Sequence, residues 1–326
     1  MKTIAVGKYL DFQCLAGACP QTCCAGFRIR IDEKDYKRFE ELEPEWLQKD
    51  ILNSVQKRED GYYFCTDKQG NCAMLDEDGL CRIQRHTSEE VLCNTCRKYP
   101  RLVNTVEDCL YLSMAASCPV ISEYLVKESV IWVEVEGQKT EKVLCFDDML
   151  LVHQAWLVYQ RNKKVAMELQ QKNNNADVLY SCFEKMAAHV LDIIIKYHDM
   201  TLQPEMFQIL EENCSSLLKN FLVTTQKLWG HVAENYVKYR IPSRRIEFPE
   251  ENDSQCIRQA MGELFLLRTL LFCSYANRQE VTEVLLSQLL RKVYRFSAHG
   301  KKIADAFDRL LEEFFKQDIL WYYILL

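Results

Sequence analysis

Glycine and proline are scarce in this chain, with 10 and 7 copies among 326 residues. Because these residues mark turns and interrupt helices, their scarcity favours long helices over a turn-rich β architecture. The N-terminus lacks the continuous apolar stretch of a signal peptide, and no window approaches the roughly 20 apolar residues that a membrane span needs. We therefore predict no membrane span and expect a cytoplasmic protein.

An excess of positive charge is also missing. The net charge is −6, and acidic and basic side chains are mixed along the whole chain. Because nucleic-acid binding depends on a basic patch or stripe, we expect no nucleic-acid partner.

The composition, 48% apolar and 27% charged, is that of a globular protein. We predict a mainly α fold with minor β structure: a cysteine-rich metal-binding domain at residues 1–120 and a helical domain at residues 121–326. A helix begins after Asp32, a candidate N-cap, and apolar periodicity resumes after Pro44. Strands are predicted at 62–64, 72–75 and 131–137, with a hairpin turn at 76–79. Further helices are predicted at 149–169, 176–197, 204–239 and 256–290, with a break at Pro242 and Pro249.

Cysteine is the residue that is abundant, and it is unevenly placed. Eleven of the 16 cysteines lie between Cys14 and Cys118. In a reducing compartment such a concentration indicates metal ligation more than disulfides, because thiolates are soft ligands for zinc and iron–sulfur clusters. The candidate metal ligands are Cys19, Cys23, Cys24, Cys72, Cys81, Cys93, Cys96 and Cys118.

The spacing leaves the kind of metal centre open. Cys93-x2-Cys96 is the close pair of a metal knuckle, but a redox dithiol has the same spacing. Eight ligands exceed the four that one zinc ion or one cubane cluster takes. Cys19-x3-Cys23 begins the cluster motif of radical enzymes that use S-adenosylmethionine, but Gly26 occupies the position of its third cysteine. That assignment therefore fails.

Two arginines, Arg97 and Arg101, follow the Cys93-x2-Cys96 pair directly. They are candidates to bind a carboxylate or phosphate, or to donate hydrogen bonds to metal-bound sulfur. The competing interpretation is a proline-stopped loop with surface charges.

The order of these motifs resembles the flagellin lysine-N-methylase family over about residues 8–120. The resemblance rests on Cys19-x3-Cys23-Cys24, Cys72, Gly79-x-Cys81, Cys93-x2-Cys96-Arg97-x-Tyr99-Pro100 and Ser117-Cys118-Pro119. Part of the pattern also recurs in small zinc- or iron-chelating domains.

The resemblance implies methylation of lysine ε-amino groups on flagellin, with S-adenosylmethionine as methyl donor and an iron–sulfur cluster, of 4Fe–4S type or replaced by zinc, in the cysteine domain. It also makes the helical domain a substrate- or partner-binding part. No Gly-x-Gly occurs, so the glycine-rich loop of ordinary methyltransferases is missing and the donor would bind beside the metal. Arg97 and Arg101 are then candidate cofactor-binding residues. Tyr99 is the candidate to take the proton of the lysine.

Two other functions are compatible with the same residues. One is a metal-chelating or redox-sensing protein without methylase activity, in which Cys93 and Cys96 form a reversible dithiol. The other is a structural zinc domain joined to a helical interaction module.

Overall fold

The computed structural model describes residues 1–106, 108–137, 139–144, 149, 160–161, 164, 176–199, 201–212, 214–298 and 301–314. Helices outnumber strands in this part of the chain, which confirms a mainly α protein with minor β structure. The predicted helix at 149–169, apart from isolated positions, and the apolar run at 319–326 lie outside the described residues. None of the described helices is both long and apolar enough to cross a membrane.

The chain forms two compact units. The first, which we call the helical unit, comprises Met1–Asp11, Leu102–Ser117 and Ile121–Leu326. The second, the cysteine-rich unit, comprises Phe12–Arg101 and Cys118–Val120.

A five-stranded sheet begins in the helical unit. Its strands are β1 (Lys2–Val6), β5 (Arg101–Val106), β6 (Cys109–Met114), β7 (Trp132–Glu136) and β8 (Lys139–Leu144), in the order β5-β6-β1-β7-β8. Strand β1 runs parallel to β6 and antiparallel to β7. Ala5, Val133 and Val135 form a buried cluster on this sheet. The predicted strand at 131–137 is confirmed as β7.

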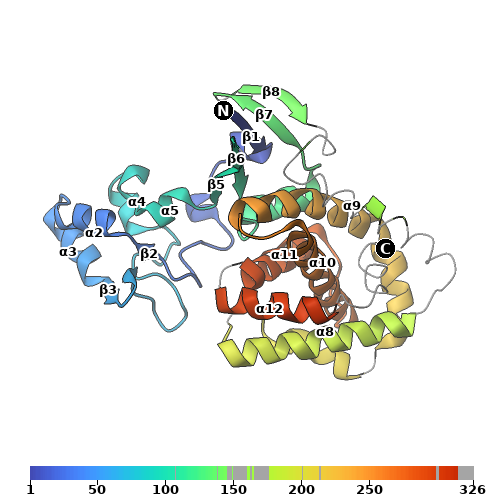
Figure 1. Ribbon diagram of the computed structural model, residues 1–326. Coiled ribbons are helices and arrows are strands. Elements are labelled where there is room, and N and C mark those ends of the chain that lie inside the picture. The colour runs from blue at the N-terminus through green and yellow to red at the C-terminus, as the bar shows by residue number, and fades with distance from the viewer. Residues whose placement is uncertain are drawn as a thin grey trace. The chain divides into compact units, whose positions relative to one another are not determined.

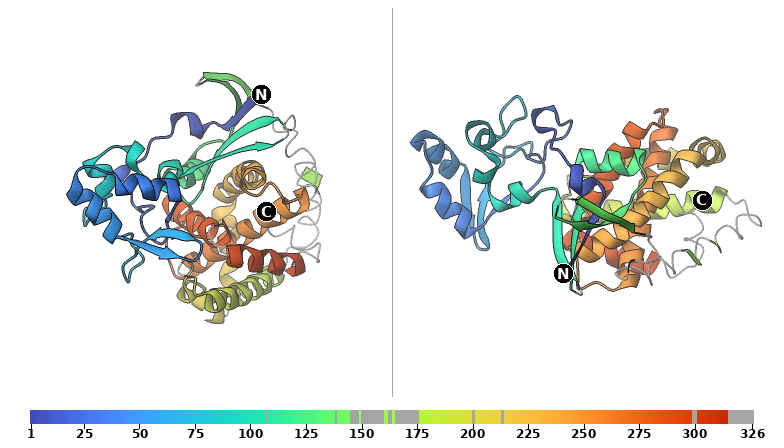
Figure 2. Two further views of the ribbon diagram at one scale, coloured as in Figure 1. Left: turned by 60° about the vertical axis from the view of Figure 1, so that its left-hand side comes forward. Right: turned by 90° about the horizontal axis from the view of Figure 1, so that it is seen from above.

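The rest of the helical unit is a bundle around one central helix (Figure 1). Its elements are α8 (Ala176–Tyr197), the 3₁₀ segment η5 (Pro204–Glu212), α9 (Ser215–Glu247), α10 (Asp253–Ala276), α11 (Glu283–Ala298) and α12 (Lys301–Phe314). Helix α10 contacts all the others and is buried along almost its whole length, which makes it the core of the bundle. Helix α9 also packs against strand β6 (Figure 2).

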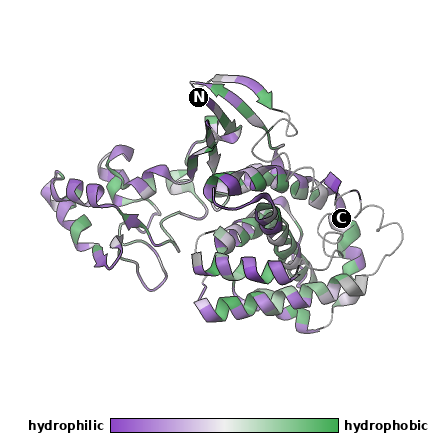
Figure 3. Ribbon diagram, viewed as in Figure 1, coloured by the Kyte–Doolittle hydropathy of each residue, from purple (hydrophilic) through white to green (hydrophobic). Residues whose placement is uncertain are grey.

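The outer helices are amphipathic, as α12 shows. Ala304, Phe307 and Leu311 recur at helical spacing and are buried, while the residues between them are more exposed. The alternation of hydrophobic and hydrophilic residues along α12 is visible in Figure 3.

Two predicted helix boundaries in the bundle are wrong. Helix α9 continues through the buried Pro242 and ends at Glu247, two residues before Pro249. The predicted helix at 256–290 is instead divided into α10 and α11. The division follows from Asn277, which caps α10, and from Arg278, whose φ of 60° leaves the helical region.

An ion pair inside the bundle explains why α9 tolerates the proline. Arg240 lies two residues before Pro242. Its guanidinium donates to both carboxylate oxygens of Glu263 on α10, at 2.8 and 3.0 Å. Both side chains are fully buried. Burial alone would raise the pKa of Glu263, but the charge of Arg240 outweighs it and holds this pKa below its usual value. This ion pair holds α9 against α10 next to Pro242, so the helix continues although the proline lacks a backbone N–H donor.

The cysteine-rich unit has a smaller core. Its elements are β2 (Arg30–Ile31), α2 (Glu33–Glu40), α3 (Glu45–Asn53), β3 (Val55–Arg58), β4 (Gly61–Phe64), α4 (Arg82–His86) and α5 (Asn94–Lys98), and the strands form a sheet in the order β2-β4-β3. The side chain of Asp32 accepts from the N–H of Asp35, which confirms the predicted N-cap. The predicted strand at 62–64 is confirmed within β4. At 72–75 only isolated bridges form, from Cys72 to Thr66 and from Leu75 to Cys81.

Candidate functional site

A cavity of about 420 Å³ lies within the cysteine-rich unit. Four segments of the chain form its wall: residues 12–24, 79–84, 89–101 and 118–120. The cysteines in the wall are Cys14, Cys19, Cys23, Cys24, Cys81, Cys96 and Cys118. Phe12, Leu15, Leu80 and Leu92 give it an apolar part. The cavity therefore combines soft sulfur ligands with apolar side chains.

Backbone hydrogen bonds fix the first cysteine segment. The N–H of Cys72 donates to the carbonyl of Cys24 at 2.7 Å, and the N–H of Gly26 donates to the carbonyl of Gly70 at 2.9 Å. Gly26 and Gly70 both have positive φ, of 74° and 82°, which few other residues adopt. These contacts hold the Cys23–Cys24 pair against the segment that leads to Cys81.

A turn brings Cys81 to the cavity. Gly79 has φ 79° and its N–H donates to the carbonyl of Asp76, so the predicted turn at 76–79 is confirmed. Arg82 then secures the segment with bonds to Asp50 at 2.8 Å and to the carbonyl of Ala73 at 2.8 Å. Its hydrogen bond with Asp50 raises the pKa of Arg82, so the contact stays charged.

Helix α2 supports the Cys93–Cys96 turn. Arg38 donates to the carbonyls of Val91 and Leu92, at 3.1 and 2.9 Å. Asp35 pairs with Arg38 at 2.7 Å and accepts from the N–H of Asn94. Sequence analysis did not single out either residue, although their i, i+3 spacing on a capped helix was a detectable signal.

Thiols in the cavity wall contact one another. Hydrogen bonds join Cys24 to Cys23 and to Cys81. The contact with Cys23 and burial raise the pKa of Cys24 to about 11. The contact with Cys24 and burial also raise the pKa of Cys81. Cys24 thus lies within hydrogen-bond reach of Cys23 in its own segment and of Cys81 in another segment.

Cys93 and Cys96 form a second contact. Their hydrogen bond raises the pKa of Cys96 and lowers that of Cys93. The charges of Cys23 and Cys24 also act on Cys96. This pair therefore adjoins the first group of thiols.

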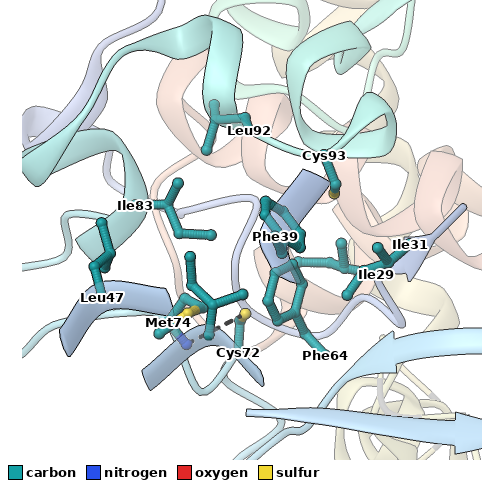
Figure 4. Packing of buried hydrophobic residues seen from close by; sticks show 11 residues of the cluster. Ile29, Ile31, Phe39, Leu47, Phe64, Cys72, Met74, Ile83, Leu92 and Cys93 are labelled. Carbon is teal, nitrogen blue, oxygen red and sulfur yellow. Dashed lines mark hydrogen bonds between the residues drawn. The ribbon is translucent and has the colours of Figure 1, made fainter. Parts of the chain in front are cut away.

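Cys72 and Cys93 lie in the hydrophobic core and are not part of the cavity wall (Figure 4). Their exposures are 5% and 0%. Burial raises the pKa of Cys72 to about 12, and its sulfur accepts from the N–H of Met74 at 3.5 Å. Of the eight predicted ligands, six line the cavity and these two pack behind it.

Soft donors of this kind fit zinc or an iron–sulfur cluster, because both bind thiolate sulfur. The described side chains contain no group of three or more His, Cys, Asp or Glu residues already converged on a point that could hold a metal ion. The donor chemistry therefore fits a metal centre, and the ligand set stays a prediction.

The three other predicted site residues differ in position. Tyr99 and Arg101 line the cavity, and the Arg101 guanidinium lies 5.2 Å from the ring centroid of Phe12. Arg97 is not among the lining residues and donates to the carbonyl of Glu90 at 3.1 Å. Sequence analysis missed Glu89, which is the one carboxylate in the described cavity wall.

Comparison with known proteins gives three relatives. The chain is 27% identical over 122 residues to the flagellar biosynthetic protein FliU of Salmonella muenchen, a match that covers 36% of this chain and 72% of that protein. Matches of the same identity and length to the lysine-N-methylases of Salmonella typhimurium and Salmonella choleraesuis cover 30% of each. The chain is related to the lysine-N-methylases. This confirms the family relationship inferred from the cysteine motifs.

The relationship concerns part of each protein, since the match spans 30% of the length of the two lysine-N-methylases. No family model matches the chain. No solved structure matches it either.

Proposed function

We propose that the protein methylates lysine ε-amino groups of a protein substrate, flagellin, with S-adenosylmethionine as the methyl donor and a cysteine-bound iron–sulfur centre. The relationship to the lysine-N-methylases supports the reaction class. The observation that carries the proposal is the cavity, because seven cysteines from four segments line one space together with Tyr99 and Arg101.

The cavity residues have separate parts in this proposal. Cys19, Cys23, Cys24, Cys81, Cys96 and Cys118 are the candidates to hold the metal centre, which would bind the amino and carboxylate groups of the donor. Arg101 would bind the carboxylate of the donor by charge-assisted hydrogen bonds. Tyr99, in its phenolate form, would take the proton that the lysine ammonium must lose before its nitrogen can act as nucleophile. The apolar side chains would exclude water from the transfer.

Metal analysis of a matched pair of variants tests the site. Cys24 lines the cavity, whereas Cys65 is a half-buried cysteine of the same unit outside the cavity wall. We expect anaerobically purified protein to contain iron and acid-labile sulfide, Cys24→Ser to lose most of both, and Cys65→Ser to retain them. Mass spectrometry of flagellin incubated with S-adenosylmethionine should show added methyl groups on lysine with the parent protein and Cys65→Ser, but not with Cys24→Ser. Zinc without sulfide in the parent protein would contradict the iron–sulfur centre.

The contact between Cys93 and Cys96 favours a second function, a reversible dithiol. Two thiols would lose two electrons and two protons to an oxidant such as glutathione disulfide and form one S–S bond. Thiol titration across a series of glutathione potentials tests it. A two-electron transition that Cys93→Ser abolishes, with flagellin lysines unmodified in vitro, would favour this function over methylation.

A further inference from the structure

A groove of about 450 Å³ lies in the helical unit between α8 and η5. Its floor is apolar and consists of Ala187, Leu191, Phe207 and Leu210, of which Phe207 and Leu210 are almost fully buried. Ala188 extends this surface toward solvent along the same helix.

Three glutamates line the same groove: Glu184 on α8, and Glu205 and Glu211 on η5. All three are exposed, and the described residues provide no ion pair for any of them. No lysine, arginine or histidine is among the described lining residues. Among the described lining residues, three acidic side chains thus border an apolar floor with no basic one beside them, so this surface is complementary to a cation that carries an aliphatic stem.

We propose that this groove binds a lysine-bearing segment of the protein substrate. The choice of occupant rests on the proposed function, in which the substrate is a protein presenting lysine. Aliphatic lysine stems and neighbouring apolar side chains would cover Ala188 and Leu191, and the ammonium groups would lie at the carboxylates. The groove thereby selects lysine-rich segments, and it does so without taking part in methyl transfer.

Neutralising the rim tests the charge argument. The variant E184Q/E205Q/E211Q removes three charges from the groove, and E136Q/E280Q/E312Q removes three from exposed positions elsewhere on the helical unit. Exposed ion pairs are individually weak, so losing three should weaken binding on the order of tenfold. The probe is a short fluorescein-labelled peptide of alternating lysine and leucine, measured by anisotropy at low salt with the full chain.

We expect the groove variant to bind this peptide about tenfold more weakly, the control variant to bind as the parent protein does, and the acetylated peptide to bind poorly to all three. Equal weakening in both variants, or equal binding of the acetylated peptide, would overturn the proposal. Methyl transfer to free lysine amide separates the two hypotheses. If the amide is methylated equally by all three proteins, the proposed function stands whatever the groove does. If peptide binding follows the groove charges but no protein methylates any amine, the groove stands and the methylase function fails.

Discussion

Helices α10 and α12 approach each other closely where Gly262 faces Leu311. A Cβ added at Gly262 would lie 2.4 Å from both Cδ atoms of Leu311 and 2.9 Å from its Cγ. Carbon atoms pack best at about 3.5–4.0 Å, so Leu311 would have to move by more than about 1 Å. Leu311 is completely buried, so this movement has to displace packed side chains.

The magnitude follows from a comparison with Gly230. Gly230 is exposed on α9, and a Cβ there would meet no atom within 4 Å. In a helix interior alanine is favoured over glycine by about 1 kcal/mol, so Gly230→Ala should stabilise the protein by up to that amount. Gly262→Ala has the same intrinsic gain but adds an overpacking cost of about 1–3 kcal/mol. The difference between the two variants therefore measures the packing cost alone.

Urea unfolding of the full chain, followed by helical circular dichroism, gives this difference from the midpoints if the slopes agree. Combining Gly262→Ala with Leu311→Ala should relieve the clash, so the double variant should be more stable than the sum of the single effects predicts by about 1–3 kcal/mol. Equal midpoints for Gly262→Ala and Gly230→Ala would refute the close approach of α10 and α12.

Two further predictions concern buried polar groups. Glu263→Gln should destabilise the protein by about 3 kcal/mol, because it leaves Arg240 poorly paired in the core. The charge of Arg240 lowers the pKa of Glu263, so the stability that Glu263 contributes is present above its unfolded pKa of about 4.3 and is lost as pH falls through the folded value. The urea midpoints of parent and variant should therefore converge between about pH 5 and pH 3. A constant gap between them would contradict this. Asn235→Ala should destabilise the protein by about 1–3 kcal/mol. The Asn235 amide donates to the backbone carbonyls of Leu125 and Glu128 and accepts from the N–H of Val130, and the variant loses all three bonds. Unchanged stability in the same urea assay would contradict this prediction.

The cysteine spacing was enough to predict which segments of the site would come together. Six of the eight predicted ligands line one cavity, and the turn that leads to Cys81 is local and ends at Gly79. The spacing could not separate Cys93, which is buried in the core, from Cys14, which lines the cavity wall. That distinction depends on how α2 packs, and a linear pattern does not contain it. Whether these cysteines bind metal stays a prediction.

Secondary structure was predictable where its cause is local and was missed where its cause is distant. The cap at Asp32 depends on neighbouring residues and was found. Strand β1 was missed because its partners, β6 and β7, lie about a hundred residues further along the chain. Pro242 was taken as a break because the ion pair of Arg240 with Glu263 is not readable from the sequence around the proline.

The two units differ in what they are able to recognise. The cavity of the cysteine-rich unit has one carboxylate, Glu89, and one guanidinium, Arg101, in its described wall, which is enough to orient a small zwitterion but offers little selectivity for a protein. The groove of the helical unit has the reverse character, with an open apolar floor, three carboxylates and no sulfur among its described lining residues. A methylase of protein lysines needs both properties, because a cofactor pocket alone would accept any amine of suitable size. If the cavity alone carries out the proposed methyl transfer, neutralising the groove should abolish selectivity for lysine-bearing protein segments while methylation of a small amine persists.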